Sequence, residues 1–441
     1  MWRKSSRGWI VIFLSLLAAC GSPPSEHDPQ FKRDTNHSGV FLGQNIVIHP
    51  SVKWKFKTDG RVFSSPIANR GTIYVGADDG NLYALNMKNG SLIWKFFTRG
   101  RVRSTPAFYN NTIFFSSYDG IFYAVDALTG TKKWTFKTAG EGQYKAPGIH
   151  GLLPANQLIT DDWDIYQSSP AIAHGHIYFG SGNGNVYALD ATNGEELWHF
   201  KTGNVVHSSP AVNDGMVFIG SWDRNMYALD LSTGKKIWNF TTGNDTVYYN
   251  QIGIQGSPLI SDSLLYFGCR DSHIYCLNKY TGRERWSFDA KGSWVIVTPT
   301  LLDNKLYAAT SDSHRFLILD PLSGKVLSEN DTKTYVFGSP VTTQGLVYVP
   351  TFGGSLMAFD AKNAKLVWTW QTKAAKMDKQ DALNDEGYYN PNIFFSRNAS
   401  DTPAEMNKIY SVGSIVSTPW IDNGVIYFGS TDSTIYALHT L

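Results

Sequence analysis

The chain has few cysteines for its length. Its 441 residues include three, Cys20, Cys269 and Cys276, and none lies in a Cys-x-x-Cys spacing. This excludes the common cysteine-based metal motifs. Cys269 and Cys276 flank a tight turn that sets each opposite other residues of the hairpin, so we expect no disulfide between them. Cys276 replaces an alanine of the repeats described below, which predicts a small buried thiol.

The chain also lacks an excess of charge of either sign. Lys and Arg number 39 and Asp and Glu 37. No basic stripe and no nucleic-acid-binding motif is present, so we expect no nucleic-acid partner.

Motifs of hydrolytic, phosphoryl-transfer and zinc-peptidase enzymes are missing as well. There is no Gly-x-Ser-x-Gly, phosphate loop or His-Glu-x-x-His. Five histidines named below show no metal spacing such as His-x-x-x-His, and isolated histidines are usually surface or satisfied core groups. We therefore predict no catalytic residue, no metal site and no bound cofactor. Histidines without metal spacing include His150, His174, His207, His273 and His314.

The one long apolar run is at the N-terminus. Basic residues precede an apolar stretch over 9–17, followed by Leu-Ala-Ala-Cys-Gly at 17–21, which is typical of a secretion signal. The last five residues resemble the bacterial lipobox, which implies cleavage after residue 19, lipidation of Cys20 and, because Gly21 follows, an outer-membrane location facing the periplasm. The alternative is a cleaved signal with an unmodified Cys20. Residues 20–50 show no period and predict a tether.

Eight copies of one pattern fill the rest of the chain. Each copy starts with Ser/Thr/Gly-x-Pro, which leads into a first strand that we call the Pro strand. An apolar strand ending in Gly, a Tyr-Ala-Leu-Asp strand and a Thr-Gly-x-x-x-Trp segment follow, and the whole pattern repeats about every 40 residues. Strand-type repeats of this length predict an all-β fold, an eight-bladed β-propeller of four-stranded antiparallel blades over 51–441. The prolines that mark the copies are Pro66, Pro106, Pro170, Pro210, Pro258, Pro299, Pro340 and Pro419.

The two ends of the repeat region predict how the ring closes. The chain ends on a Tyr-Ala-Leu strand with no outer strand after it, whereas an outer-type strand around 51–57 precedes the first Pro strand. We expect this N-terminal strand to complete the eighth blade, because closure removes open sheet edges.

Tryptophans recur at one position of the repeat, which indicates packing between blades rather than a binding function. Ser328 breaks the series and predicts a weaker border between blades, and Ala364 replaces the usual turn glycine. The structural tryptophans are Trp54, Trp94, Trp134, Trp198, Trp238, Trp286 and Trp368.

All extra length lies in three insertions, near 140–165, 244–255 and 373–416. Each joins the outer strand of one blade to the inner strand of the next, so all three emerge on the face of the ring that carries the Asp-Gly turns. Long loops on a rigid scaffold often bind partners or ligands. The alternative is solvated turns with aromatic side chains that pack the loops. The candidate binding face consists of Asp162, Trp163, Asp164, Trp222, Asp223, Arg224, Asn250, Gln251, Arg270, Asp271, His273 and Trp294.

The repeat resembles the tryptophan-docking repeat shared by two families. One is the quinoprotein alcohol dehydrogenases, and the other is the B-subunit lipoprotein of the outer-membrane β-barrel assembly machinery. The dehydrogenases carry adjacent cysteines over the quinone and a Glu/Asn/Asp calcium set, neither of which can be matched in this chain. The lipobox, the mature length and the eight repeats resemble the assembly lipoprotein, although the three insertions depart from a minimal version of it.

Two functions follow as expectations. The first, which the resemblance to the assembly lipoprotein implies, is a non-catalytic, lipid-anchored scaffold whose loop face binds the outer-membrane protein assembly complex or another envelope protein. The alternative is a periplasmic dehydrogenase-like or small-ligand-binding propeller that would use the same face, with pyrroloquinoline quinone and calcium as its cofactors.

Overall fold

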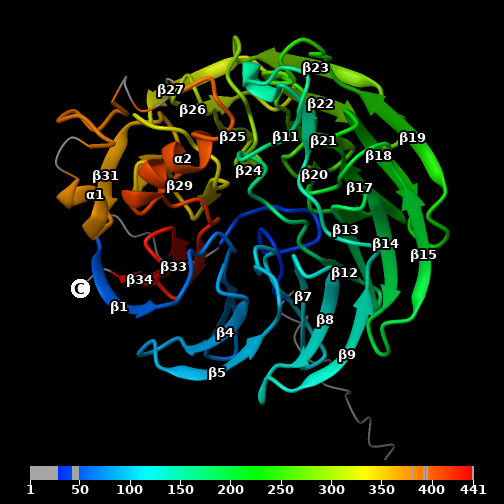
Figure 1. Ribbon diagram of the computed structural model, residues 1–441. Helices are drawn as coiled ribbons and strands as arrows, with labels where there is room; N and C mark the ends of the chain where they lie inside the picture. Colours follow the sequence, from blue (N-terminus) through cyan, green and yellow to red (C-terminus); the bar gives the residue numbers. More distant parts are fainter. Residues whose placement is uncertain (1–27, 42–48, 379–380, 391–392, 394–395, 440–441) are drawn as a thin grey trace, which may run out of the picture.

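The structure is a computed structural model and describes residues 28–41, 49–378, 381–390, 393 and 396–439. Eight four-stranded antiparallel sheets surround a central axis as blades, which confirms the predicted fold (Figure 1). We number the blades from the first Pro strand. The predicted signal segment and Cys20 lie outside the described residues. No helix in the described part of the chain is long and apolar enough to cross a membrane.

Each of the first four blades runs in chain order from an innermost to an outermost strand. The strands are β2 (Ile67–Asn69), β3 (Thr72–Gly76), β4 (Asn81–Asn86) and β5 (Leu92–Phe97) in blade 1; β6 (Ala107–Tyr109), β7 (Thr112–Ser117), β8 (Ile121–Asp126) and β9 (Lys132–Lys137) in blade 2; β12 (Ala171–Ala173), β13 (His176–Gly180), β14 (Asn185–Asp190) and β15 (Glu196–Lys201) in blade 3; and β16 (Ala211–Asn213), β17 (Met216–Gly220), β18 (Asn225–Asp230) and β19 (Lys236–Thr241) in blade 4.

The next three blades repeat this order, and blade 8 differs in its outermost strand. The strands are β20 (Leu259–Ser261), β21 (Leu264–Gly268), β22 (His273–Asn278) and β23 (Glu284–Asp289) in blade 5; β24 (Thr300–Leu302), β25 (Lys305–Ala309), β26 (Arg315–Leu319) and β27 (Val326–Asp331) in blade 6; β28 (Val341–Thr342), β29 (Leu346–Pro350), β30 (Ser355–Asp360) and β31 (Leu366–Gln371) in blade 7; and β32 (Trp420–Asp422), β33 (Val425–Ser430), β34 (Thr434–His439) and β1 (Ser51–Lys57) in blade 8.

The ring closes where the sequence predicts. The N-terminal strand β1 pairs antiparallel with β34, the last strand of the chain, with Lys55 opposite Tyr436. The third strands, such as β4, are buried along nearly their whole length, whereas outermost strands such as β5 are largely exposed. The core therefore lies between neighbouring blades.

The tryptophans lock each blade to the next. Trp94 pairs with Ala84 within blade 1, and its indole N–H donates to the carbonyl of Ala127 in blade 2 at 3.1 Å. Its ring lies on Gly130, where an added Cβ would come within 2.6 Å of the ring, so this turn requires glycine. The same contact recurs in Trp54–Gly90, Trp134–Gly194, Trp198–Gly234, Trp238–Gly282 and Trp286–Gly324.

The two departures from the repeat lie at the same border, between blades 6 and 7. Ser328 on β27 donates to the carbonyl of Asn363 at 2.6 Å, and Asn330 Nδ2 donates to the carbonyl of Ala364 at 2.9 Å. Ala364 stands at the turn position that is glycine in the six borders named above. Without an indole on top of the turn there is room for the alanine Cβ, so the two exceptions compensate each other.

Both described cysteines are buried and free, as the prediction of no disulfide requires. Cys276 pairs with Tyr266 and Trp286 in its blade and fills the place of the usual alanine.

Two of the insertions contain secondary structure. The first holds β10 (Lys145–Pro147), the short 3₁₀ turn η1 (Ile149–Gly151) and β11 (Leu158–Thr160), and β10 and β11 pair as a two-stranded sheet. The third holds α1 (Lys373–Met377) and α2 (Thr402–Ser411). Thr372 caps α1 by accepting the amide of Ala375 at 3.2 Å.

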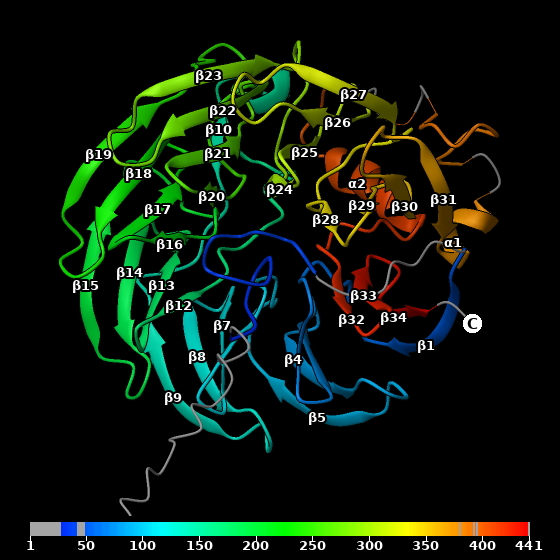
Figure 2. The same ribbon diagram turned by 180° about the vertical axis from the view of Figure 1, so that it is seen from behind.

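Residues 28–41, which the sequence assigns to the tether, lie in the axial channel of the ring; we call them the plug (Figure 2). Main-chain hydrogen bonds join the plug to the innermost strands of four blades, and the Gln30 side chain accepts the amide of Ile172 in a fifth at 2.9 Å. The main-chain bonds run from Phe108 N to Pro29 O (2.8 Å), Val212 N to Thr35 O (2.8 Å), Ile260 N to Asn36 O (3.0 Å) and Phe41 N to Thr342 O (2.7 Å).

Two basic side chains of the plug are buried in the channel. Burial lowers the pKa of Lys32 despite the nearby Asp34 carboxylate. His37 Nδ1 lies 2.7 Å from the carbonyl oxygen of Pro258, and burial lowers the pKa of His37 to about 4. The Lys32 ammonium donates to the carbonyls of Thr298 (3.1 Å), Pro299 (3.0 Å) and Pro340 (3.0 Å) and to the hydroxyl of Thr300.

Candidate functional site

The three insertions join into one cover over the axis, which we call the lid (Figure 1). Leu153 N donates to the carbonyl of Arg397, and Ala399 N donates back to the carbonyl of Leu153, which connects the first insertion to the third. His150 N donates to the carbonyl of Tyr248 at 2.7 Å, which connects the first insertion to the second. The lid is therefore one hydrogen-bonded unit rather than three separate loops.

Trp163 of the first insertion is the centre of an aromatic cluster beneath the lid. Its ring centroid lies 6.1 Å from that of Trp294 and 5.8 Å from those of Tyr335 and Phe337. The buried side of α2 joins the same cluster. These apolar side chains fill the space that an open funnel would occupy.

Arg270 holds the first insertion onto blade 5. Its guanidinium lies between two indoles, 4.7 Å from the ring centroid of Trp222 and 3.7 Å from that of Trp294. Its Nη1 donates to Asp161 at 2.6 Å, and both side chains are fully buried. Tyr144 stacks on the other side of Trp222 at 4.4 Å. A desolvated cation over aromatic faces is stabilised more strongly than at an exposed site.

His150 extends this pair toward the second insertion. Its Nε2 lies 2.9 Å from Asp161 Oδ1, and its Nδ1 lies 2.8 Å from Asn250 Oδ1. Burial opposes ionisation of Asp161, but Arg270 and then His150 outweigh it and hold the pKa of Asp161 well below its usual range. The carboxylate is therefore charged and paired inside the lid.

A second buried ion pair connects the first insertion to blade 4. His207 Nδ1 lies 2.7 Å from Asp164 Oδ1, and Glu141 approaches His207 Nε2 at 3.6 Å. Burial would lower the pKa of His207, but Asp164 and then Glu141 raise it to about 10. Asp164 also accepts the amide of Tyr144 at 2.7 Å. His207 is thus an imidazolium at neutral pH.

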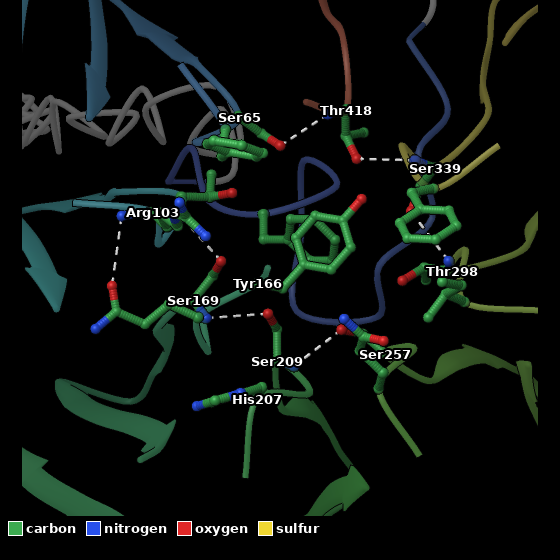
Figure 3. Close-up of a pocket in the computed structure, with 17 residues that line it drawn as sticks. Ser65, Arg103, Tyr166, Ser169, His207, Ser209, Ser257, Thr298, Ser339 and Thr418 are labelled. Carbon is green, nitrogen blue, oxygen red and sulfur yellow. Dashed lines mark hydrogen bonds between the residues drawn. The ribbon is translucent and has the colours of Figure 1, made fainter. Parts of the chain in front are cut away.

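Below the lid, a small cavity lies on the axis (Figure 3). Tyr166 and Arg103 line it from the lid side and Phe31 from the plug. Hydroxyl side chains just before the innermost strands surround it. Each accepts a hydrogen bond from a main-chain amide of the preceding blade. These bonds run from Thr105 N to Ser169 (2.9 Å), Ser169 N to Ser209 (3.0 Å), Ser209 N to Ser257 (2.8 Å), Thr298 N to Ser339 (2.9 Å), Ser339 N to Thr418 (3.1 Å) and Thr418 N to Ser65 (2.8 Å).

The structure brings many of the predicted site residues together, but largely beneath the surface. Trp222, Arg270 and Asp164 are at most 1% exposed, and Trp294 is 7% exposed. In this state they hold the lid and are not available to a partner. We predicted them from residue type and loop position, and the loops that fold over them bury them.

The predicted turn residues serve mainly to support the blades. Asp223 and Asp271 accept the hydroxyls of Tyr227 and Tyr275, each at 2.7 Å. Gln251 Nε2 donates to the carbonyl of Gly292 at 3.2 Å, so it joins the second insertion to the loop between blades 5 and 6. Partly buried positions are taken by Asp162, Trp163, Arg224, Asn250 and His273.

Sequence reasoning missed several residues that define this site. Asp161 and Glu141 carry no motif, and His150 and His207 were read as isolated histidines. Arg103 pairs with Asp78 through two contacts of 2.7 Å and lies on the ring of Phe63 at 4.1 Å. The partners are far apart in the chain, so no local spacing signals them.

A quinone cofactor does not fit this axis. The cavity has a volume of about 30 Å³, room for about one water molecule. Pockets for small organic ligands usually measure roughly 300–1,000 Å³. In the described part of the chain, no group of three or more His, Cys, Asp or Glu side chains could hold a metal ion. Trp163 and its aromatic neighbours occupy the entrance.

Comparison with protein families gives a match over most of the propeller. A sequence model described as "Outer membrane protein assembly factor BamB" matches residues 50–157, 155–287, 250–332 and 270–383. A comparison with curated proteins gave no match.

Solved structures with the same fold include a BamB and two dehydrogenases. BamB from Moraxella catarrhalis has a TM-score of 0.62 and 16% identity, covering 89% of this chain and 100% of its own. A europium-containing methanol dehydrogenase has a TM-score of 0.68 and 14% identity, covering 94% and 99%. A quinohemoprotein alcohol dehydrogenase from Comamonas testosteroni has a TM-score of 0.68 and 14% identity, covering 93% and 80%. At these identities the likeness shows the fold alone.

Proposed function

The chain belongs to the family described as outer membrane protein assembly factor BamB, and from that premise we propose that it is a non-catalytic, lipid-anchored scaffold for the assembly of outer-membrane β-barrel proteins. Its partner would be the outer-membrane assembly complex or another envelope protein. Its location would be the periplasmic side of the outer membrane, with Cys20 as the lipid-bearing residue.

The observation that carries this proposal is the sealed axis. A propeller enzyme needs a cavity that admits its substrate and cofactor, whereas here the lid and its aromatic cluster fill the entrance. What the lid offers instead is its outer surface. Large apolar side chains exposed there are Leu153 (49%), Leu158 (61%), Val247 (72%) and Tyr248 (59%).

These exposed side chains come from the first two insertions and are held by the buried contacts beneath. The His150 amide bonds to the carbonyl of Tyr248, and the Tyr248 ring lies beside Gly151. Exposed apolar groups on a rigid support are a common feature of protein interfaces. The buried ion pairs would therefore act by fixing the contact surface rather than by touching the partner.

Capture of the partner tests the proposal. The lipidated full-length protein with Leu158→Ser, Val247→Ser and Tyr248→Ser combined should keep its thermal midpoint but capture less assembly complex from solubilised outer membranes. A loss of more than about 1 kcal/mol in binding, roughly fivefold, is expected of a true hot spot. The matched control is Ile237→Ser on β19, which is 48% exposed on the rim. Unchanged capture by the triple variant would contradict the lid as the contact surface.

A quinone titration separates this function from the dehydrogenase-like alternative. We expect no stoichiometric binding of pyrroloquinoline quinone with calcium, because the axial cavity is too small. Saturable absorbance changes together with alcohol-dependent dye reduction would favour the enzyme instead.

A further inference from the structure

The plug and the lid close opposite ends of the axial channel. The insertions enter at the first residues of the innermost strands, so the lid lies at that end. At the other end of β16, Asn213 Nδ2 donates to Asn36 Oδ1 of the plug at 3.1 Å. We call this opposite side the plug face. It carries the turns between the first two strands of each blade and between the last two, which bond to each other, as in Met87 N to Gly71 O.

The plug shortens the connection to the lipid. The carbonyl of Pro29 accepts the amide of Phe108, so the chain is held at the inner edge of blade 2 from there on. Cys20 lies eight residues before Asp28, the first described residue. Eight residues span at most roughly 28 Å when fully extended. The part of the predicted tether that precedes the plug is therefore far shorter than residues 20–50.

This length limits how the ring can stand on a membrane. A domain of about 390 residues has a radius of gyration of about 21 Å, which corresponds to a body of roughly 27 Å radius. A chain leaving the middle of the plug face would use nearly its whole length to reach the rim. It cannot also pass around the edge of the ring to the lid.

We propose that the plug face lies against the membrane surface and that the lid faces away from it. This orientation rests on the proposed lipid anchor at Cys20. It deepens the proposed function, because the lid would then meet a part of the partner that stands away from the bilayer.

The plug face carries apolar side chains at its turn tips that suit a lipid surface. Leu128 is 72% exposed, Tyr280 48% and Leu322 75%. Each tip is held by the turn residue two positions earlier, whose side chain accepts its amide; Asp126 accepts that of Leu128 at 3.0 Å. Tyrosine and leucine side chains are stabilised when they move from water to the interface between headgroups and acyl chains.

Site-specific quenching tests the orientation. Leu322→Cys on the plug face and Val247→Cys on the lid are matched, since these residues are 75% and 72% exposed. Cys269 and Cys276 are buried and should not react with a dye. The lipidated full-length variants are labelled and placed in phosphatidylethanolamine–phosphatidylglycerol vesicles that contain a headgroup spin-labelled lipid. We expect loss of fluorescence at position 322 and none at position 247.

Controls distinguish the orientation from the anchor itself. A long flexible Gly/Ser insertion between His27 and Asp28 should remove the difference between the two positions, because it frees the ring to rotate. Equal quenching at the two positions without the insertion, or stronger quenching at 247, would overturn the orientation while leaving the scaffold function standing. Absence of the diacylglyceryl mass on Cys20 would overturn both the anchor and the orientation.

Discussion

The two ends of the axial channel are sealed by different chemistry. At the lid, charged side chains pair inside an aromatic layer, as Arg270 does with Asp161. At the plug, main-chain groups of residues 28–41 bond to the free edges of innermost strands. The lid thus depends on particular side chains, whereas the plug combines main-chain bonds to the strand edges with side-chain contacts such as those of Lys32.

The ends also differ in the charge state of their histidines. His207 beneath the lid is held as a cation, with its pKa raised to about 10. His37 in the plug is held neutral, with its pKa lowered to about 4. Acid and alkali should therefore loosen opposite ends of the same channel.

The largest effect is expected from Arg270→Ala at the lid. It leaves Asp161 buried without its guanidinium partner, with the His150 imidazole still 2.9 Å away, and breaking a buried pair in this way costs about 3–5 kcal/mol. Urea unfolding measures the loss. The control is Arg315→Ala, whose pair with Glu329 is 27% and 50% exposed and should cost about 0–1 kcal/mol. Similar losses in the two variants would show that burial does not set the strength of the lid.

Acid should release the plug. Well above pH 6.5 His37 is neutral in both the docked and the free plug, so docking of the plug has its full free energy there. As pH falls from 6.5 toward 4, His37 becomes protonated in the free plug but not in the docked plug, so docking weakens by up to about 3 kcal/mol. The protection of the amides of Val212 and Ile260, which bond to the plug, should fall; protection here is the exchange rate compared with the intrinsic rate of an unprotected amide at the same pH. In His37→Gln this loss of protection should disappear; if it persists, another group such as Lys32 carries the effect.

Alkali should loosen the lid. The pKa of His207 is raised above its ordinary 6.5. The stability that the protonated His207 contributes to the folded protein is therefore fully present below pH 6.5 and is lost as pH rises toward 10. The free energy of unfolding should fall by at most about 1.4 kcal/mol per pH unit, which amounts to roughly 2 kcal/mol over the first pH units above neutrality. Urea unfolding of the wild type against His207→Gln measures it. A variant that loses stability with pH as steeply as the wild type would contradict the assignment.

The smallest effect is expected from Gln30→Ala in the plug. It removes one side-chain acceptor from the amide of Ile172, a loss of about 1 kcal/mol. Because the main-chain bonds of the plug remain, exchange should rise at Ile172 and not at Ile260. Gln157→Ala, at an exposed lid position, serves as the control and should leave both amides unchanged. A global rise in exchange would show that the plug depends on single side chains after all.

The ring itself could be predicted from the sequence because its constraints are local and repeated. A strand ending in Gly, a Tyr-Ala-Leu strand and a tryptophan recur in each copy, and the final copy lacks an outer strand that β1 supplies. Ser328 and Ala364 could be recognised as exceptions from the same pattern. That they face each other across a blade border required the structure, because contacts between repeats are not written in either repeat alone.

The candidate site was only partly predictable. Trp222, Arg270 and Trp294 are brought together, but as a buried stack rather than as exposed contact residues. Within this stack Arg270 pairs with Asp161, which lies 109 residues away and carries no motif. Sequence position indicated the correct face for the insertions; whether they stand open or fold over the axis depends on pairings among them.

The sequence by itself therefore determined the eight-bladed ring, its closure by the N-terminal strand and the face that carries the insertions, because short-range strand and turn preferences repeat with one period. The tertiary structure alone decided that the axis is sealed at both ends. The lid is held by ion pairs between residues far apart in the chain. Residues 28–41 bind both through main-chain groups that every sequence possesses and through buried side chains such as Lys32, whose partners are also far apart in the chain.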